Sequence, residues 1–223
     1  AYIDSNIIGT FNIMEEAKNQ NIKHLLIAST SSVYGANENM PFKENDKADM
    51  QMTTYAATKK ANESMAHAYS HLHKLPTTMF RFFTVYGPWG RPDMALFKFT
   101  KNILSGDPIE VYNKGNMVRD FTYIDDVVKS ILKIYLKPST KNTPYNVFNV
   151  GRGKQISMIN FLKIIETILK SKANIQNYKK FSGDVKNTMA NINSLFSYIS
   201  YKPNTDISIG LKRYIKWYKD FYK

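Results

Sequence analysis

Three scarcities in the sequence remove several classes of protein at the outset. The 223 residues contain no cysteine, which excludes disulfide bridges, thiolate nucleophiles and cysteine-ligated metals. No uninterrupted apolar run reaches the roughly eighteen residues that a transmembrane helix needs. Arginine is also scarce, with 5 residues against 26 lysines. We therefore expect a cytoplasmic protein without a membrane span.

The positive charge is large, but its distribution is not typical of a nucleic-acid-binding protein. The formal net charge is +13, and such a surplus is one mark of proteins that bind phosphate backbones. Here it comes from lysines scattered along the chain, whereas arginine is the better bidentate reader of phosphates and bases. We expect no nucleic-acid partner, although the field would help to gather an anionic substrate.

Helical and strand-like periodicities alternate along most of the chain. This alternation indicates an α/β fold with a doubly wound parallel sheet, which binds ligands beyond the carboxyl ends of its strands. The expected strands cover residues 24–29, 77–83, 109–112, 120–124 and 145–150. The expected helices cover residues 4–19, 54–74, about 93–104 and 157–169, with another that Asp125 caps and a last one around 211–217.

A tyrosine and a lysine lie four residues apart on the second expected helix. Positions i and i+4 share one face of a helix, so the Lys59 ammonium can lie beside the Tyr55 phenol and favour its ionised form. A tyrosinate is a usable general base for a hydroxyl group. The spacing alone is unspecific. A second such pair, Tyr198 and Lys202, precedes Pro203, which disfavours a continuing helix, so we treat only the first pair as a candidate site.

A hydroxyl-rich segment follows the first expected strand. Thr30, Ser31 and Ser32 stand in Ser29-Thr-Ser-Ser-Val-Tyr-Gly35, at the carboxyl end of the apolar run. A sheet of this class places its ligand there, and the strand–loop–helix return would bring Tyr55 to the same edge. The alternative is an ordinary hydroxyl-rich turn, which the spacing alone favours.

Taken together, these segments resemble the extended short-chain dehydrogenase/reductases, the NAD-dependent epimerase/dehydratase family. The resemblance rests on Tyr55-Ala-Ala-Thr-Lys-Lys-Ala-Asn-Glu63 and Arg81-Phe-Phe-Thr-Val-Tyr-Gly-Pro88. Within the family, Arg81 through Ala95 is similar to the UDP-glucuronate 4-epimerases, and Arg119 through Asp126 and Ser182-Gly-Asp184 continue the match. The resemblance covers essentially the whole chain.

The resemblance implies a Rossmann-type doubly wound parallel sheet and a smaller C-terminal α/β substrate domain. Residues 1–92 would be the remainder of the NAD-binding domain, and residues 93–223 mainly the sugar-nucleotide region, with elements around 120–150 returning to the first domain. No glycine fingerprint occurs, so we expect the N-terminal strands that carry it in the family to be missing. We expect the chain to be inactive alone, and a homodimer to form through helices near residues 7–14 and 55–72.

The resemblance also implies roles for individual residues. Tyr55 would be the catalytic base, Lys59 its partner, and Thr30 the hydroxyl that bonds the reacting sugar oxygen. The implied contacts to NAD come from Tyr55, Lys59 and Ser29. The implied contacts to a UDP-sugar come from Thr30, Ser31 and Ser32 at the reacting centre, Thr84 and Arg91 at a C5 carboxylate, Tyr112 at the uracil, Arg119 at the pyrophosphate and Asp184 at the nucleotide ribose.

The reaction that the resemblance implies is NAD-dependent 4-epimerisation of UDP-glucuronate to UDP-galacturonate through a transient 4-keto sugar. Ser31 and Ser32 stand where related dehydratases carry Asp-Glu, which disfavours elimination of water. The alternatives are a UDP-glucose 4-epimerase, a UDP-glucuronate decarboxylase and a non-catalytic basic module that binds nucleic acid. The alternative for Arg91 is that it braces its Gly/Pro loop. His67 and His71 invite a zinc hypothesis, but neither a zincin glutamate nor a cysteine accompanies them, so we expect no metal.

Overall fold

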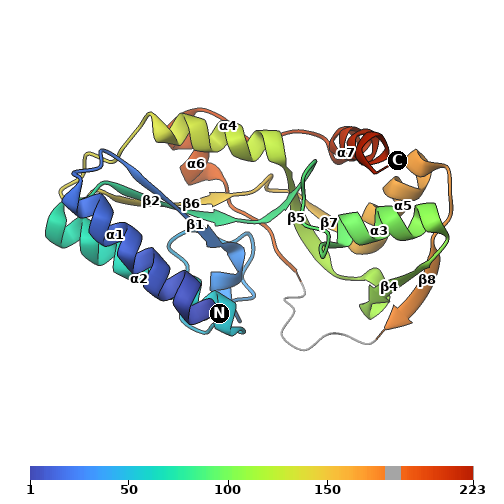
Figure 1. Ribbon diagram of the computed structural model, residues 1–223, viewed down its shortest axis with the longest axis horizontal. Helices are drawn as coiled ribbons and strands as arrows, with labels where there is room; N and C mark the ends of the chain where they lie inside the picture. The colour runs from blue at the N-terminus through green and yellow to red at the C-terminus, as the bar shows by residue number, and fades with distance from the viewer. Residues whose placement is uncertain (179–186, 223) are drawn as a thin grey trace.

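A three-stranded parallel sheet forms the centre of one half of the molecule in a computed structural model that describes residues 1–178 and 187–222 (Figure 1). The strands lie in the order β1-β2-β6, and the register aligns Ala28 with Phe80 and Phe80 with Phe148. All three carboxyl ends therefore meet at one edge of the sheet. The bounds are β1 (Leu25–Thr30), β2 (Thr77–Phe82) and β6 (Tyr145–Val150).

Helices cover both faces of this sheet, as a doubly wound fold requires. Successive residues of a strand point to opposite faces. Accordingly, Met79 of β2 packs with Met14 and Ala66 on one face, while the next residue, Phe80, packs with Val127 on the other. The first face carries α1 (Gly9–Asn19) and α2 (Thr54–His73), and the second carries α4 (Ile124–Tyr135) and α6 (Asn193–Ile199) (Figure 1).

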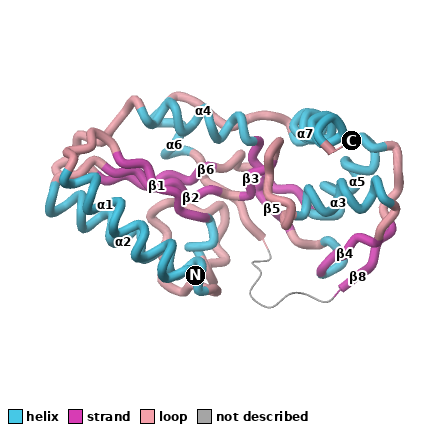
Figure 2. The backbone as a smooth tube through the Cα atoms, viewed as in Figure 1, coloured by secondary structure: helices cyan, strands magenta, loops and turns pink. Residues whose placement is uncertain are grey.

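The other half of the molecule contains further strands and helices (Figure 2). Its core is built around stacked aromatic rings. The rings of Phe121 and Phe161 stack with their centroids 4.1 Å apart, and Leu211 and Tyr214 of the last helix complete the cluster. The strands are β3 (Thr84–Tyr86), β5 (Val118–Tyr123) and β7 (Gln155–Ser157) in one sheet, and β4 (Pro108–Tyr112) with β8 (Asn174–Tyr178) in another. The helices are α3 (Ala95–Ser105), α5 (Met158–Leu169) and α7 (Ile207–Phe221).

All five strands expected from the sequence are present, with ends that differ by at most two residues from the prediction. The first helix differs in its winding, because residues 3–8 form a π-helix, η1 (Ile3–Ile8), before α1 begins. Three short or polar strands (β3, β7 and β8), the helix α6 and two 3-10 turns, η2 (Ser31–Tyr34) and η3 (Asn113–Gly115), were not expected.

The prediction that Asp125 caps a helix is wrong. The strand β5 runs directly into α4, so Tyr123 occupies the capping position without a side-chain hydrogen bond, and Asp125 falls in the first turn. There it lies 3.6 Å from Arg213 of α7. Its neighbour Asp126 is buried and accepts hydrogen bonds from the Tyr201 hydroxyl at 2.6 Å and from the amides of residues 204 and 205. The acidic pair thus joins α4 to the C-terminal segment.

The expected division of the chain at residue 92 stays a prediction, although β6, which follows that point, does return to the sheet of β1 and β2. Across residues 1–178 and 187–222, no helix combines the length and the hydropathy that crossing a bilayer requires.

Candidate active site

A cavity of about 1240 Å³ opens between the two halves of the molecule. It begins at the carboxyl ends of β1 and β2 and reaches β4 and α3 on the other side. Ten of the eleven site residues expected from the sequence line it, namely Ser29, Thr30, Ser31, Ser32, Tyr55, Lys59, Thr84, Arg91, Tyr112 and Arg119. The eleventh, Asp184, lies outside the described residues.

Tyr55 and Lys59 lie in the first turns of α2, which the Thr53 side chain caps by accepting a hydrogen bond from the Ala56 amide. The Lys59 ammonium donates a hydrogen bond of 3.1 Å to the carbonyl oxygen of Ala28 in β1. Burial lowers the pKa of Lys59. The hydrogen bond to Ala28 holds the ammonium near the end of the strand, in the same cavity as the Tyr55 phenol.

The three hydroxyls after Ser29 are fixed by the local backbone. Thr30 caps the 3-10 turn η2, and its Oγ1 accepts a hydrogen bond of 3.2 Å from the Ser32 amide. The Thr30 hydroxyl also donates to Ser32 Oγ at 3.2 Å. Thr30 is nearly buried, whereas Ser31 and Ser32 are half-buried. The segment is therefore a capped turn and also the wall of the cavity, so the two interpretations of its hydroxyls are compatible.

A buried ion pair lies behind this wall. Glu63, one turn after Lys59 on α2, accepts two hydrogen bonds of 2.8 Å from the Arg81 guanidinium of β2, and both side chains are 3% exposed. Glu63 also accepts a hydrogen bond of 2.7 Å from the Ser29 hydroxyl. The Arg81 guanidinium stacks over the Tyr34 ring, 4.8 Å from its centroid. This network ties α2 to the ends of β1 and β2 and so fixes where Tyr55 and Lys59 lie.

Arg91 projects from the loop between β3 and α3 and is paired with a carboxylate of its own loop. Its Nε and Nη2 atoms donate to the two Asp93 oxygens at 3.1 and 2.9 Å. Both side chains are largely exposed, at 74% and 64%. The same loop presents Trp89 to the cavity, and its ring contacts Trp217 and Phe221 of α7 at centroid distances of 5.3 and 4.7 Å.

The far end of the cavity carries the two residues expected to hold the nucleotide. Tyr112, at the end of β4, has its ring 5.7 Å from that of Tyr178 and donates a hydrogen bond to Glu110 at 3.0 Å. The half-buried Arg119 of β5 donates a hydrogen bond of 3.1 Å to the carbonyl of Val118, among its other interactions. An aromatic ring and a guanidinium are suited to a nucleobase and a phosphate group.

Sequence reasoning assigned no role to several residues that line the cavity or contact residues that line it. Trp89 contacts the distant helix α7, and no periodicity marks such a loop residue. Asp93 pairs with Arg91, only two residues away, a spacing that could have placed it near the site. Glu63 lies on the same helical face as Lys59, a spacing that could have placed it near the site. Tyr2, whose ring is 5.7 Å from that of Tyr55, had no signal in the sequence.

The donors near β1 are suited to the nicotinamide ribose of a dinucleotide. A ribose diol needs hydrogen-bonding partners, and the Lys59 ammonium and the Tyr55 phenol line the cavity together at the carboxyl end of a parallel sheet. A metal site is a separate question. Among the described residues, no cluster of three or more histidines and carboxylates is suited to a metal ion. The His71 ring nitrogen Nδ1 lies 3.3 Å from the Thr143 hydroxyl.

A doubly wound parallel sheet with a Tyr–Lys helix at its carboxyl edge defines a Rossmann-type enzyme that uses a dinucleotide. Residues 1–151 match the NAD dependent epimerase/dehydratase family. The chain belongs to this family, and NAD is its cofactor.

Relatives and solved structures extend this result. Protein CapI of Staphylococcus aureus is 49% identical over all of this chain, which covers 71% of that protein. A probable UDP-glucuronate 4-epimerase of Rhizobium meliloti is 46% identical over all of this chain and 70% of its own length. The structure of UDP-glucuronic acid 4-epimerase from Bacillus cereus with UDP-glucuronic acid and NAD matches 99% of this chain and 69% of that one, at 31% identity and a TM-score of 0.92.

Proposed function

We propose that this chain carries the catalytic and substrate-binding residues of an isomerase that converts UDP-glucuronate to UDP-galacturonate by NAD-dependent 4-epimerisation. The observation that carries the proposal is one cavity in which Tyr55, Lys59 and Thr30 lie at the sheet end and Arg119 and Tyr112 at the other. Relatives named for UDP-glucuronate 4-epimerisation, and a structural neighbour containing UDP-glucuronic acid and NAD, support the same reaction.

The chemistry needs a proton acceptor at the sugar 4-hydroxyl. When bound, NAD supplies a reversible hydride acceptor, so that C4 can be oxidised and then reduced without net redox change. Tyr55 removes the 4-hydroxyl proton and later returns it, and the Lys59 ammonium lines the same cavity. Thr30 donates a hydrogen bond to the reacting oxygen. Ser31 and Ser32 bind the same end of the sugar, and Ser29, held by Glu63, supports the ribose side.

Inversion at C4 requires the 4-keto sugar to present its other face, while the nucleotide stays bound. Arg119 is suited to the pyrophosphate, because guanidinium and phosphate oxygens form paired hydrogen bonds, and Tyr112 to the uracil. Asp184, assigned to the nucleotide ribose, lies outside the described residues. Affinity would then reside at the far end of the cavity, and the sugar would be free to turn near Tyr55.

Recognition of the glucuronate carboxylate falls to Thr84 and Arg91. Both line the cavity on the side of β3 and its following loop, and a guanidinium fork matches a carboxylate in geometry and charge. The Asp93 pair means that Arg91 also braces its own loop. A neutral UDP-sugar such as UDP-glucose is therefore the second candidate substrate.

The assembly that fits this function is a homodimer. The segment η1, which continues into α1, exposes Ile8, half of whose surface is open to solvent, and α2 exposes the small side chains of Ala57 and Ala68. A second copy could cover this face as a bundle of four helices. Residues 1–92 would form the dinucleotide half and most of residues 93–223 the substrate half. The cytoplasmic location remains a prediction from composition.

The experiment that tests the function supplies UDP-glucuronate and UDP-glucose separately to the natural full-length protein with NAD and identifies the products by NMR. We expect UDP-galacturonate from the first substrate and slower or no conversion of the second. Tyr55→Phe should lower kcat by about two to four orders of magnitude, because a general base is lost, while circular dichroism stays unchanged. Full turnover by this variant would rule out Tyr55 as the base.

A further inference from the structure

We propose that Asp93 is a resident carboxylate that occupies the Arg91 fork until the carboxylate of the substrate replaces it. The inference rests on the proposed function, because it assumes that Arg91 binds the sugar carboxylate. It adds a specificity-determining residue to which the sequence assigned no role.

The geometry of the pair is that of a bound carboxylate. The two Asp93 oxygens receive one hydrogen bond each from Nε and Nη2 of Arg91, at 3.1 and 2.9 Å. This side-on fork is one of the two bidentate faces of a guanidinium. The third polar contact of Arg91, from Nη2 to the Met94 sulfur at 3.6 Å, is weak. A sugar carboxylate that sought the side-on fork would therefore meet Asp93 already in place.

A tight turn imposes this arrangement. The Met94 amide donates to the Arg91 carbonyl at 3.1 Å, which closes a turn over residues 91–94. Pro92 stands at the second position of that turn, where its fixed φ favours the conformation. The turn brings the side chains of Arg91 and Asp93 to one side, inside the cavity wall. The pair is thus built by the local sequence, without help from a distant element.

The pair can be broken at little cost. Both side chains are more than half exposed, and ion pairs in contact with water contribute little to stability. Asp93 also has an alternative position, because it lies one residue before Met94, which occupies the capping position of α3 without a side-chain hydrogen bond. A carboxylate near a helix N-terminus is stabilised by the helix dipole and by the free amides of the first turn. Release from Arg91 would therefore not leave Asp93 without favourable contacts.

The exchange has a consequence for substrate choice. A substrate with a carboxylate must displace Asp93, whereas a neutral sugar leaves the pair intact. The resident carboxylate thus lowers the affinity for UDP-glucuronate and keeps the positive charge of Arg91 neutralised between turnovers. It leaves the affinity for UDP-glucose unchanged.

The test is an equilibrium titration of the natural full-length protein, loaded with NAD, in a Tyr55→Phe background that prevents turnover. The variant Asp93→Asn keeps the size of the side chain but removes the competing charge. We expect its dissociation constant for UDP-glucuronate to fall about five-fold, the upper range for an exposed ion pair, and that for UDP-glucose to stay the same. The matched control is Asp107→Asn, which removes an equal charge beyond the other end of α3, where Asp107 bonds to Ser105.

Arg91→Ala separates the inference from the function on which it rests. Two results together support the exchange. Arg91→Ala should weaken the binding of UDP-glucuronate but not that of UDP-glucose, and Asp93→Asn should not strengthen the binding of UDP-glucuronate when Arg91 is already alanine. The two residues then act as one unit. Unchanged or weaker binding of UDP-glucuronate by Asp93→Asn overturns the exchange alone, as does an equal gain for UDP-glucose. If Arg91→Ala changes the dissociation constants for UDP-glucuronate and UDP-glucose equally, the proposed carboxylate contact is contradicted instead.

Discussion

At the scale of single residues, the buried carboxylate of Glu63 supports the site from behind the cavity wall. Glu63 joins three elements through the hydrogen bonds that it accepts from Ser29 and Arg81. Burial by itself raises the pKa of Glu63, but the hydrogen bonds and charge of Arg81 outweigh it, and the pKa lies below its usual value of 4.5. The folded state therefore favours the ionised carboxylate more strongly than the unfolded chain does.

Glu63→Gln should destabilise the protein and change how its stability depends on pH. Leaving the buried Arg81 without its charged partner costs about 3–5 kcal/mol of unfolding free energy. Because the pKa is lowered on folding, the contribution of Glu63 is present above about pH 4.5 and is lost as the pH falls below that value. Urea unfolding at pH 7 and at pH 4 should show a smaller acid loss in the variant than in the natural protein.

The exposed Glu38 offers a control for this experiment. Glu38→Gln removes the same charge from the surface and should change the unfolding free energy by less than about 0.5 kcal/mol. Equal destabilisation by both variants, or the same acid loss with and without Glu63, would contradict a special role for the buried pair.

At the scale of elements, the sequence predicted those whose burial follows a simple period. β2 is buried along nearly its whole length, and α2 buries residues on one face throughout. The ends of both elements were therefore predicted to within two residues. β8 was missed because all five of its residues are exposed and its polar sequence carries no apolar signal. The Asp125 cap failed because a strand passed into a helix without a connecting loop.

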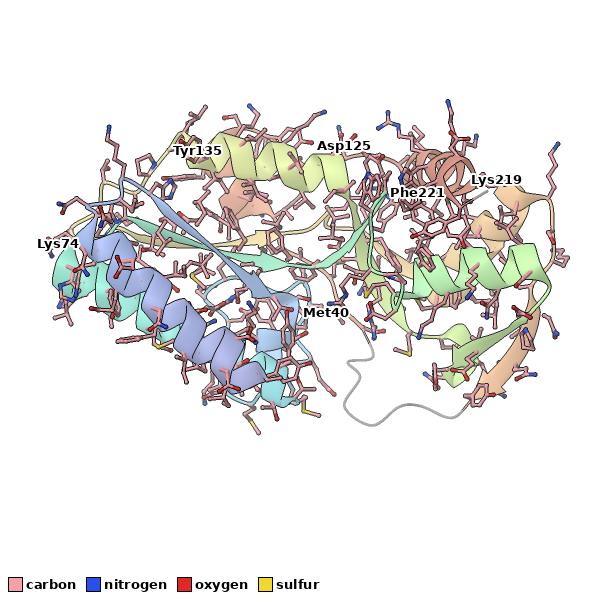
Figure 3. All side chains as sticks on the ribbon, in the orientation of Figure 1. Met40, Lys74, Asp125, Tyr135, Lys219 and Phe221 are labelled. Carbon is pink, nitrogen blue, oxygen red and sulfur yellow. The ribbon has the colours of Figure 1, made fainter. Side chains whose placement is uncertain are left out.

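The residues of the site also differ in how well the sequence predicts them. Residues on periodic elements or in short motifs, such as Tyr55 and Thr30, were brought together as expected. The contacts of Trp89 with α7 could not be predicted, because they join residues more than a hundred positions apart through packing alone. Trp89 also has a left-handed backbone, with φ at +62°, which is uncommon for a large side chain. Contacts with Trp217 and with Phe221, labelled in Figure 3, hold it there.

Trp89→Gly should separate loop position from stability. Glycine adopts the left-handed conformation freely, which relieves about 1 kcal/mol, while the lost ring contacts cost about 0.5–1.5 kcal/mol. We expect the unfolding free energy to change by less than about 1 kcal/mol. The loop that carries Arg91 loses its anchor, so KM for UDP-glucuronate should rise about ten-fold with kcat largely retained.

Trp89→Phe provides the comparison, since it keeps an aromatic ring against α7. It should restore most of the natural KM in steady-state assays. If glycine and phenylalanine behave alike, the contacts with α7 do not position the Arg91 loop.

At the scale of the whole molecule, the cavity lies between two cores that share few elements. One core lies on the two faces of the β1-β2-β6 sheet, and the other surrounds Phe121 and Phe161. The reacting end belongs to the first half, and Tyr112 and Arg119 belong to the second. The substrate that we propose, with a sugar at one end and a nucleotide at the other, would bridge both halves.

The proposed homodimer is the last property of the whole molecule that the structure makes testable. Ile8 of η1 is 50% exposed, and it is neither one of the residues that line the cavity nor a member of the buried clusters described above. Burying an isoleucine side chain between two copies would stabilise a dimer by about 1.5–3 kcal/mol per side chain, whereas a lysine there would place like charges across the symmetry axis. Ile8→Lys should therefore convert a dimer of the natural protein into monomers at micromolar concentration, as measured by light scattering after size exclusion. Ile209→Lys, at a comparably exposed position on α7, should leave the dimer intact. A natural protein of monomer mass, or an Ile8→Lys variant that stays dimeric, would contradict this interface.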